Sequence, residues 1–404
     1  MQTYSFDKIR DEINIELKNR QVDNKKKYGF QLELFESKFA IKSEYIPGKL
    51  EIGYDDIYKI DNESKIIIKK IERKSIGEFD DKYNIKIEKL RNIEFKYNTF
   101  TNCKFNNIEF YNCTFFGNIF SNCLFKNVIF VNCNFYNINE CILICNSKTI
   151  FIDCQFKNCN MEKSIFQNVD LHNIKFEHTN LKGAILKKVY INNVCITDCD
   201  CRSFKIINSD VKEFEFEDNY LTKFDEHTFI DKIKIDKRYK KSYAVAFKVY
   251  KGIASKFEAN ALLNNAGEYY YMSKCMEYKS LTGMNKVKAA IFWLLCGYGE
   301  RPTFALITSL EIVLVFAIMY MLTGLSVGEY VISYKDVSLQ GFPYQNLDRD
   351  FMKSLYFSIV TFTTVGYGDI TPIGYSVLLS GIEMMLGVTM VGIWTATLAR
   401  KITR

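Results

Sequence analysis

The sequence is poor in proline and glycine, its first residues do not predict a signal peptide, and it has no strong excess of charge. Only 4 prolines and 20 glycines occur among 404 residues, which excludes a collagen-like chain and proline-rich linkers. Its beginning is charged throughout and contains no apolar core of a secretory signal peptide. The 54 basic and 47 acidic side chains give a net charge of +7, which excludes a disordered polyelectrolyte and a strongly acidic mimic of DNA.

Patterns typical of catalysis and metal binding are missing from the sequence as well. The 13 cysteines do not form the paired C-x-x-C arrangement of a zinc knuckle, and without a signal peptide we expect them to stay reduced. The sequence also contains no recognisable pair of nucleophile and base, no phosphate-binding loop and no cluster of metal ligands. We therefore expect that the protein is not an enzyme and has no catalytic residues.

A strict period of five dominates the middle of the chain. Phenylalanine stands at every fifth position from Phe95 to Phe135, and bulky residues continue at the same spacing from Phe151 to Leu221. The step from Phe135 to Phe151 is one residue longer than three pentads, so we expect a bulge or loop near Cys141–Thr149. Neither a helix nor a flat strand has a period of five, whereas a coil with four sides of five residues does.

A second series, two residues before each bulky position, holds small side chains. It contains seven cysteines, which we expect to be buried as compact hydrophobes rather than to bind zinc or serve redox chemistry. The series comprises Cys103, Cys113, Cys123, Cys133, Cys154, Cys159, Ser164, Val169, Thr179, Ala184, Val189, Val194, Cys199 and Ser209. The double pattern resembles the pentapeptide-repeat family, which implies a right-handed quadrilateral β-solenoid over residues 90–230, with about six coils roughly 4.8 Å apart.

The regions on either side of the repeats have weaker patterns. We interpret residues 1–89 as an N-terminal cytosolic cap region, with a helix near Phe6–Lys18 and strands further on. Apolar side chains at helical spacing predict a helical hairpin over residues 238–283, with a break near Asn264–Gly267, which we expect to be a packed spacer rather than a ligand site. Basic residues ahead of a short apolar stretch predict an interfacial amphipathic helix over residues 285–300.

Two apolar segments near the C-terminus are long enough to cross a membrane. They cover residues 303–325 and 373–399, and each contains one charged side chain. Basic residues precede the first segment and follow the second but are rare between them, which predicts a multi-pass protein of the plasma membrane with both termini cytoplasmic. Neither segment has Arg or Lys at every third residue, so we expect no S4-type voltage sensor, and we expect any large cytosolic regulatory region to be N-terminal.

A short apolar segment and a glycine-containing loop lie between the two predicted spans. Residues 350–362 predict a re-entrant helix, and residues 363–369 read TTVGYGD. Irregular backbone at membrane depth is tolerated only where it is buried in protein or lines a water-filled path. The segment Thr364–Asp369 resembles the selectivity filter of potassium channels, and the order span, pore helix, filter, span over residues 303–404 is similar to the minimal pore domain of that family.

The resemblance implies how the loop would bind ions. The backbone carbonyls of Thr364, Val365, Gly366 and Tyr367, together with the Thr364 hydroxyl, would replace the water around K⁺, and Gly368 completes the ion-binding segment. The two glycines are suited to positive φ angles. Since one strand supplies only one side of each cage, the resemblance implies a homotetramer in the lipid bilayer, with K⁺ in the pore and no other cofactor.

Further residues are predicted to support the filter. By the same resemblance, Thr363, Asp369, Tyr356 and Phe357 are filter-support residues. Many relatives carry Trp where this chain has Tyr and Phe, so the sequence leaves open whether these side chains bond to Asp369.

The second span contains two residues with competing interpretations. Gly387 matches the inner-helix gating hinge of the family, but a glycine also permits tight contact between membrane helices, and both interpretations stay open. A carboxyl group at membrane depth needs partners, so we expect Glu383 to bond to the pore helix rather than to form an ion site. The acidic residues Asp369, Glu329, Asp336, Asp348 and Asp350 either enrich cations at the pore mouth or are simply solvated.

Three functional interpretations follow from these patterns. The first is a potassium-selective channel that conducts K⁺ passively, with the N-terminal half as a regulatory or assembly domain for an unidentified cytosolic ligand or protein. The alternative is a membrane-anchored scaffold whose solenoid binds a protein partner. Some pentapeptide-repeat proteins mimic nucleic acid to inhibit a topoisomerase, but residues 91–222 contain 14 basic and 14 acidic side chains and do not mimic an anionic duplex, so we expect no nucleic-acid partner.

Overall fold

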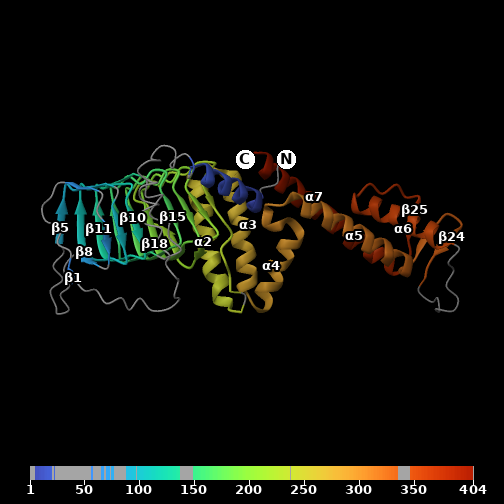
Figure 1. Ribbon diagram of the computed structural model, residues 1–404. Helices are drawn as coiled ribbons and strands as arrows, with labels where there is room; N and C mark the ends of the chain where they lie inside the picture. Colours follow the sequence, from blue (N-terminus) through green and yellow to red (C-terminus); the bar gives the residue numbers. More distant parts are fainter. Residues whose placement is uncertain are drawn as a thin grey trace. The chain divides into compact units, whose positions relative to one another are not determined.

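The structure of the protein is a computed structural model that divides into two compact units, Met1–Ser280 and Leu281–Arg404. It describes residues 5–20, 22, 56–57, 65–67, 70–72, 74–76, 88–96, 98–136, 149–236, 238–334 and 346–403. Figure 1 shows the strands of the first unit as a ladder and the helices of the second in orange and red.

The first unit is built around a four-sided coil of parallel strands, as the sequence predicts. Each regular turn of the coil takes 20 residues, so that Phe105 pairs with Phe125 and, further along, Leu171 pairs with Ile191. The largest sheet contains 11 strands. These are β1 (Asp56–Ile57), β4 (Lys74–Ile76), β5 (Glu88–Arg91), β8 (Lys104–Tyr111), β11 (Leu124–Val131), β13 (Thr149–Ile152), β14 (Gln155–Lys157), β16 (Val169–Glu177), β18 (Tyr190–Thr197), β20 (Asp210–Val211) and β21 (Phe214–Phe216).

Three smaller parallel sheets form the remaining sides. They contain three, four and four strands. The first consists of β3 (Lys70–Glu72), β7 (Thr99–Thr101) and β10 (Ile119–Ser121); the second of β2 (Lys65–Ile67), β6 (Glu94–Lys96), β9 (Thr114–Phe116) and β12 (Asn134–Tyr136); the third of β15 (Ile165–Gln167), β17 (Ile185–Lys187), β19 (Lys205–Ile207) and β22 (Phe229–Ile230).

Columns of stacked phenylalanine rings fill the interior of the solenoid. The ring of Phe130 lies 5.2 Å from that of Phe110 and 4.9 Å from that of Phe156, and both pairs are nearly parallel. These separations match the spacing of adjacent strands, so one ring from each coil stacks directly on the ring of the next. The fifth-residue series is therefore core filling, as predicted.

The small series also points inward. Its seven cysteines are between 0% and 2% exposed, which confirms their predicted burial. Burial raises the pKa of Cys154 and of Cys199 to about 12. These thiols stay protonated at neutral pH, and a protonated buried thiol packs as a small hydrophobe.

The corners of the coil are formed by residues with positive φ, many of which are asparagines. Asn102, Asn107, Asn122 and Asn127 all have φ between 52° and 54°. Asparagine tolerates this left-handed conformation better than other residues with a side chain. Asn122 donates from its side-chain amide to Asn102, and Asn127 donates to Asn107, both over 2.8 Å, so the corner side chains also link successive coils.

The limits of the solenoid differ from those predicted. Strands β2, β3 and β4 pair with β6, β7 and β8, so the coil begins inside the region interpreted as a separate cap. At the other end Leu221 is 38% exposed and no longer faces the axis, and the inward role passes to Phe224.

One turn of the solenoid is longer than the others. Phe125 pairs with Phe151, so this turn contains six residues more than the regular turn of 20. The predicted bulge near Cys141–Thr149 lies largely outside the described residues, and strand β13 begins at Thr149.

Residues 6–20 form a helix that packs on the C-terminal part of the solenoid rather than on its N-terminal end. Phe6 lies 5.6 Å from Phe229 and 5.8 Å from Tyr269, measured between ring centroids. Arg20 donates to the carbonyl oxygen of Gly183 over 2.6 Å, a contact between residues 163 positions apart. The beginning of the chain therefore covers coils that lie much further along the sequence.

Helices α2 (Lys240–Ala259) and α3 (Leu263–Ser280) form the predicted helical hairpin. The ring of Phe257 stacks on that of Tyr269 at 5.1 Å, and the Tyr269 hydroxyl donates to the Ile230 carbonyl oxygen over 2.8 Å. The break between the helices falls at residues 260–262 rather than at Asn264–Gly267, because the Asn260 side chain bonds to the Thr222 carbonyl oxygen of the solenoid.

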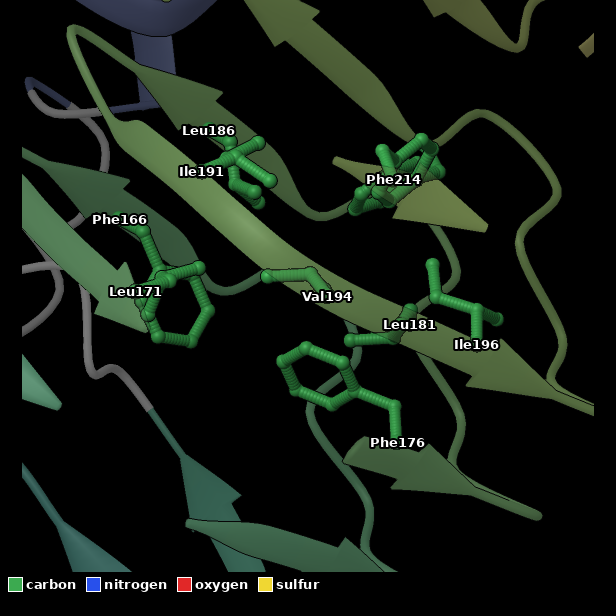
Figure 2. A pocket seen from close by; sticks show the side chains of 10 residues that line it. Phe166, Leu171, Phe176, Leu181, Leu186, Ile191, Val194, Ile196 and Phe214 are labelled. Atoms are coloured by element: carbon green, nitrogen blue, oxygen red, sulfur yellow. The ribbon is translucent and has the colours of Figure 1, made fainter. Parts of the chain in front are cut away.

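The core changes character along the solenoid. Figure 2 shows Phe166 and Phe176 with Leu171, Leu186 and Ile191 around a common space, whereas the positions from Phe95 to Phe135 are all phenylalanine. The cavity left between these smaller side chains is about 10 Å³, and all the residues that line it are apolar. A space of this size is at the lower limit for one water molecule, so it is a packing defect rather than a ligand site.

Because the phenylalanine columns fill the axis, truncating one ring is expected to destabilise the solenoid strongly. We expect Phe130→Ala to lower the free energy of unfolding by about 3–5 kcal/mol, since the stacked rings on either side cannot collapse into the cavity. Lys126→Ala, on an exposed position of the same strand, is the matched control and is expected to change it by less than about 0.5 kcal/mol. Urea titration of the full chain, followed by circular dichroism, measures both; equal effects would contradict the axial packing.

The second unit is mainly helical. It contains an antiparallel sheet of three short strands. Its elements are α4 (Gly283–Cys296), the short 3-10 helix η2 (Gly297–Gly299), α5 (Pro302–Thr323), β23 (Leu325–Val327), β24 (Tyr330–Ile332), α6 (Leu347–Phe362), β25 (Ile370–Pro372) and α7 (Tyr375–Ile402). Helices α5 and α7 cover the two predicted spans and are long and apolar enough to cross a membrane.

Helix α4 lies where the interfacial helix is predicted. None of its residues is buried, and Met284, Phe292 and Leu294 are among the apolar side chains that it exposes. The helix ends at Gly297, whose φ is +52°, and the chain then turns into α5. Such an exposed apolar helix with basic residues in its first turns suits a membrane surface.

Candidate functional site

The segment 363–369 connects helix α6 to strand β25 and has no regular secondary structure. Gly366 and Gly368 have φ angles of +58° and +78°, in the left-handed region expected for them, and Thr364 has a φ of +60°. The Val365 amide still donates to the carbonyl oxygen of Val360 over 3.0 Å, so the segment leaves the end of α6 directly. A backbone in which residues of opposite handedness alternate turns successive carbonyl groups toward one side.

The segment is exposed on the single chain. Val365 is 52% exposed and Tyr367 is 71% exposed, although both are large apolar or aromatic side chains. All seven residues of this segment are exposed, whereas Phe362 before it and Ile370 after it are buried. Among these residues Thr364 is the one with a side chain that has a positive φ, a conformation that is costly for it.

Helix α6 aims its C-terminal end at this segment. Asp348 and Asp350 lie in its first turn, where a negative charge favours the positive end of the helix dipole. At the other end Thr363 donates from its hydroxyl to the Ile359 carbonyl oxygen over 2.7 Å. The partial negative charge of this end therefore lies beside Thr364 and would favour a cation there.

The predicted support residues divide into two groups. The side chains of Tyr356 and Asp369 interact electrostatically, although this chain lacks the Trp that many relatives carry. The ring of Phe357 instead lies 4.9 Å from that of Tyr320 on α5, edge to face. Tyr356 thus ties the outer end of the segment to α6, while Phe357 ties α6 to α5.

Glu383 joins three helices through its buried carboxyl group. The Tyr320 hydroxyl of α5 donates to it over 2.7 Å, and the Ser358 hydroxyl of α6 donates a second hydrogen bond. Its exposed fraction is 0%. The expected bond from Glu383 to the pore helix is therefore present, and the carboxyl group holds α5, α6 and α7 together.

Gly387 lies directly against the end of the pore helix. A Cβ atom at this position would come within 1.9 Å of the Phe362 carbonyl oxygen and within 2.8 Å of the Phe362 carbonyl carbon. Only a glycine permits this approach. The geometry favours the close-contact interpretation of Gly387, while its role as a gating hinge stays a prediction.

The opposite end of the unit contains a charged contact that the sequence did not indicate. Glu300, which follows η2, has an exposed fraction of 1% in its side chain and lies 3.0 Å from the Arg400 guanidinium near the end of α7. A buried carboxylate needs such a partner. The turn between α4 and α5 is thereby fastened to the last turns of α7.

Two further residues missed in the sequence lie beyond the outer end of the segment. The Tyr334 hydroxyl donates to the Asp350 carboxylate over 2.9 Å, and Arg349 lies 3.2 Å from the other oxygen of Asp350. Desolvation and the neighbouring carboxylate raise the pKa of Tyr334. Asp350 is therefore a buried, bonded acid, and neither of its two predicted roles, cation enrichment or simple solvation, fits it. The position of an acid in the first turn of a helix was visible in the sequence, but its tyrosine partner was not.

Comparison with known proteins finds a family model that matches a segment of each unit. Residues 334–404 match the family model described as "Ion channel". Residues 149–187 and 164–200 match the family model described as "Pentapeptide repeats", with 8 copies. The chain therefore carries pentapeptide repeats and a segment similar to an ion channel domain, together with two helices that are long and apolar enough to cross a membrane.

Solved structures of a pentapeptide-repeat protein resemble part of the chain. The full-length structure of QnrB1, a plasmid-mediated fluoroquinolone resistance protein, is 16% identical over 41% of this chain and 81% of that chain, with a TM-score of 0.19. A trypsin-treated variant of QnrB1 is 15% identical over 41% and 78%, with a TM-score of 0.24. Similarity at this level carries no functional information. The comparison with curated proteins returned no match.

Proposed function

We propose that this protein is a potassium-selective channel whose pore lies on the axis of a homotetramer. The observation that carries the proposal is the exposed segment Thr364–Asp369, in which Gly366 and Gly368 adopt positive φ angles between a helix end and a strand. Carbonyl groups turned to one side of such a strand replace the hydration shell of K⁺ when several copies surround the ion. One chain offers only one side of that cage.

Exposed apolar surface supports the assembly of several chains in a bilayer. Helix α7 exposes Leu378, Met385 and Val388 by 67%, 76% and 63%, and α5 exposes Leu310 by 59%. Lipid accounts for one such face of each helix, and a neighbouring copy accounts for another. The exposed Tyr367 then becomes an interface residue beside the filter of the next copy.

The proposed channel lies in the plasma membrane with both termini in the cytoplasm. This orientation follows from Lys286, Lys288 and Arg301 before α5 and from Arg400 and Lys401 at the end of α7. The solenoid, with its buried protonated thiols, is then intracellular and acts in regulation or assembly. Movements of the turn between α4 and α5 reach the end of α7 through the Glu300–Arg400 pair.

Ion flux through purified protein tests the proposal against the scaffold alternative. The full chain is reconstituted into liposomes loaded with KCl, and K⁺ efflux is followed with a fluorescent dye and a proton carrier. The channel predicts efflux that rises with the protein-to-lipid ratio, and it predicts four copies by native mass spectrometry. Liposomes that stay sealed, with protein correctly folded and inserted, would favour the membrane-anchored scaffold.

A further inference from the structure

The strand that leaves the filter is part of a small sheet on its outer side. Asp369 is followed at once by β25, whose residues Ile370 and Thr371 pair with Val327 and Ser326 of β23 in antiparallel register. Strand β23 pairs in turn with β24. Ile370 is only 5% exposed and belongs to the core formed by the outer ends of α5 and α6. The filter therefore ends in packed, hydrogen-bonded backbone.

The far side of this sheet is fastened to the beginning of the pore helix. Tyr334 follows β24, its amide donates to the Met321 carbonyl oxygen over 2.8 Å, and its hydroxyl donates to Asp350 over 2.9 Å. Asp350 lies in the first turn of α6 and is held on its other oxygen by Arg349. The Arg349 guanidinium lies over the ring of Tyr330, 4.9 Å from its centroid, which ties the pair back to β24.

These contacts close a ring of bonds around the outer end of the filter. From the N-terminal turn of α6 the path runs through Asp350 and Tyr334 to the β23–β24 hairpin, then across the sheet to β25 and Asp369, and returns to the end of α6 along residues 363–369 of the chain. Every link is a hydrogen bond, a paired strand or the chain itself. The filter exit cannot move away from α6 unless one of these links breaks.

We propose that the β23–β24 hairpin braces the outer end of the filter, and that Tyr334 and Asp350 are positioning residues for ion selection. This inference rests on the proposed channel function and identifies what maintains its filter geometry. K⁺ and Na⁺ have the same charge and differ in size, so discrimination between them depends on how precisely the ligand oxygens are held. Tyr334 touches no ion; it acts by anchoring the hairpin to α6.

Removal of the Tyr334 hydroxyl tests the brace without removing its ring. In planar bilayers containing the full-length protein, we expect the K⁺ current of Tyr334→Phe to decay at least about tenfold faster than wild type during sustained conduction, with a lower K⁺-to-Na⁺ permeability ratio. Asp350→Asn keeps an oxygen that accepts from Tyr334, so its effect should be smaller. The double variant should be no worse than Tyr334→Phe alone, because Asp350→Asn only weakens the link that Tyr334→Phe already removes.

Tyr330→Phe is the matched control on the same hairpin. It keeps the ring that Arg349 covers, and no hydrogen bond of its hydroxyl is found among residues 238–334 and 346–403, so wild-type decay and permeability are expected. Size-exclusion chromatography verifies that each variant assembles as wild type does. If Tyr334→Phe fails to assemble, Asp350→Ala, which removes the oxygen that accepts from Tyr334, carries the test: a decay rate above wild type supports the brace, and a wild-type decay rate overturns it.

The outcomes separate the brace from the channel itself. Wild-type protein that conducts Na⁺ as readily as K⁺ would overturn the proposed function and the brace with it. Wild-type protein that selects K⁺, together with Tyr334→Phe that decays and selects as wild type does, would overturn the brace alone.

Discussion

Gly366→Ala is expected to abolish K⁺ conduction. The residue has a φ of +58°, and a side chain in this region costs about 1–2 kcal/mol in each copy of the chain. The strand relieves that strain by rotating the peptide, which turns a carbonyl oxygen away from the ion path. Because the same rotation occurs in every subunit, a complete ring of ligands is lost.

The control for Gly366→Ala is Gly283→Ala, which introduces a similar backbone strain at a position far from the filter in the sequence. Gly283 has a φ of +61°, and no atom lies within 4 Å of where its Cβ would stand. Gly283→Ala is therefore expected to leave K⁺ flux within about twofold of wild type. K⁺ flux from liposomes is measured for both variants. Wild-type flux through the Gly366→Ala protein would contradict the proposed role of Thr364–Asp369 as the filter.

Gly387→Ala is expected to disrupt the pore domain rather than stiffen it. The added Cβ would lie 1.9 Å from the Phe362 carbonyl oxygen, so α7 and the end of α6 must move apart. Overpacking of this kind costs about 1–3 kcal/mol, and the displaced atoms are those that carry the first residues of the filter. We expect a lower melting temperature of the assembled protein and a loss of K⁺ flux together.

A gating hinge predicts a different result for the same substitution. Alanine favours a straight helix by about 1 kcal/mol over glycine, so a hinge residue would yield a stable protein with altered opening. Gly392→Ala, on the same helix with no atom within 4 Å of its Cβ position, isolates that stiffening effect. A Gly387→Ala protein that melts as the Gly392→Ala protein does would contradict the close-contact interpretation and support the hinge.

The repeats were predictable because each pentad repeats the same pattern of inward-facing residues. Phe95 to Phe135 mark an inward position that every coil requires, and the small residues two positions earlier mark its neighbour. A local period of this kind needs no knowledge of distant contacts. The positive φ angles of Gly366 and Gly368 were predictable from the glycines themselves, while the role of Thr364–Asp369 as a filter stays a proposal.

What escaped prediction depends on partners far apart in the sequence. The helix of residues 6–20 meets Gly183 through Arg20, and nothing near Arg20 signals that partner. Strands β2–β4 join the solenoid by backbone pairing, without the aromatic residues that marked the later coils. Leu221 kept the period of five but lost its place on the axis, because the regular coil ends before it.

In the candidate site, too, the sequence did not identify partners that are far apart along the chain. Asp350 was visible as an acid at a helix start, but its bond to Tyr334 forms only when the β23–β24 hairpin folds back on α6. Glu383 was recognisable as a buried acid in need of a partner, and the partner on the pore helix proved to be Ser358. The free-energy cost of burying an unpaired carboxyl group indicates that a partner exists, but the tertiary structure decides which residue it is.

The reversal potential of the wild-type current tests the central claim most directly. The full-length protein is inserted in a planar bilayer with K⁺ on one side and Na⁺ on the other, and the voltage at zero current is recorded. A cage of carbonyl oxygens fitted to K⁺ predicts a reversal potential close to the K⁺ equilibrium value. A reversal potential near zero, which means equal passage of Na⁺ and K⁺, would contradict it.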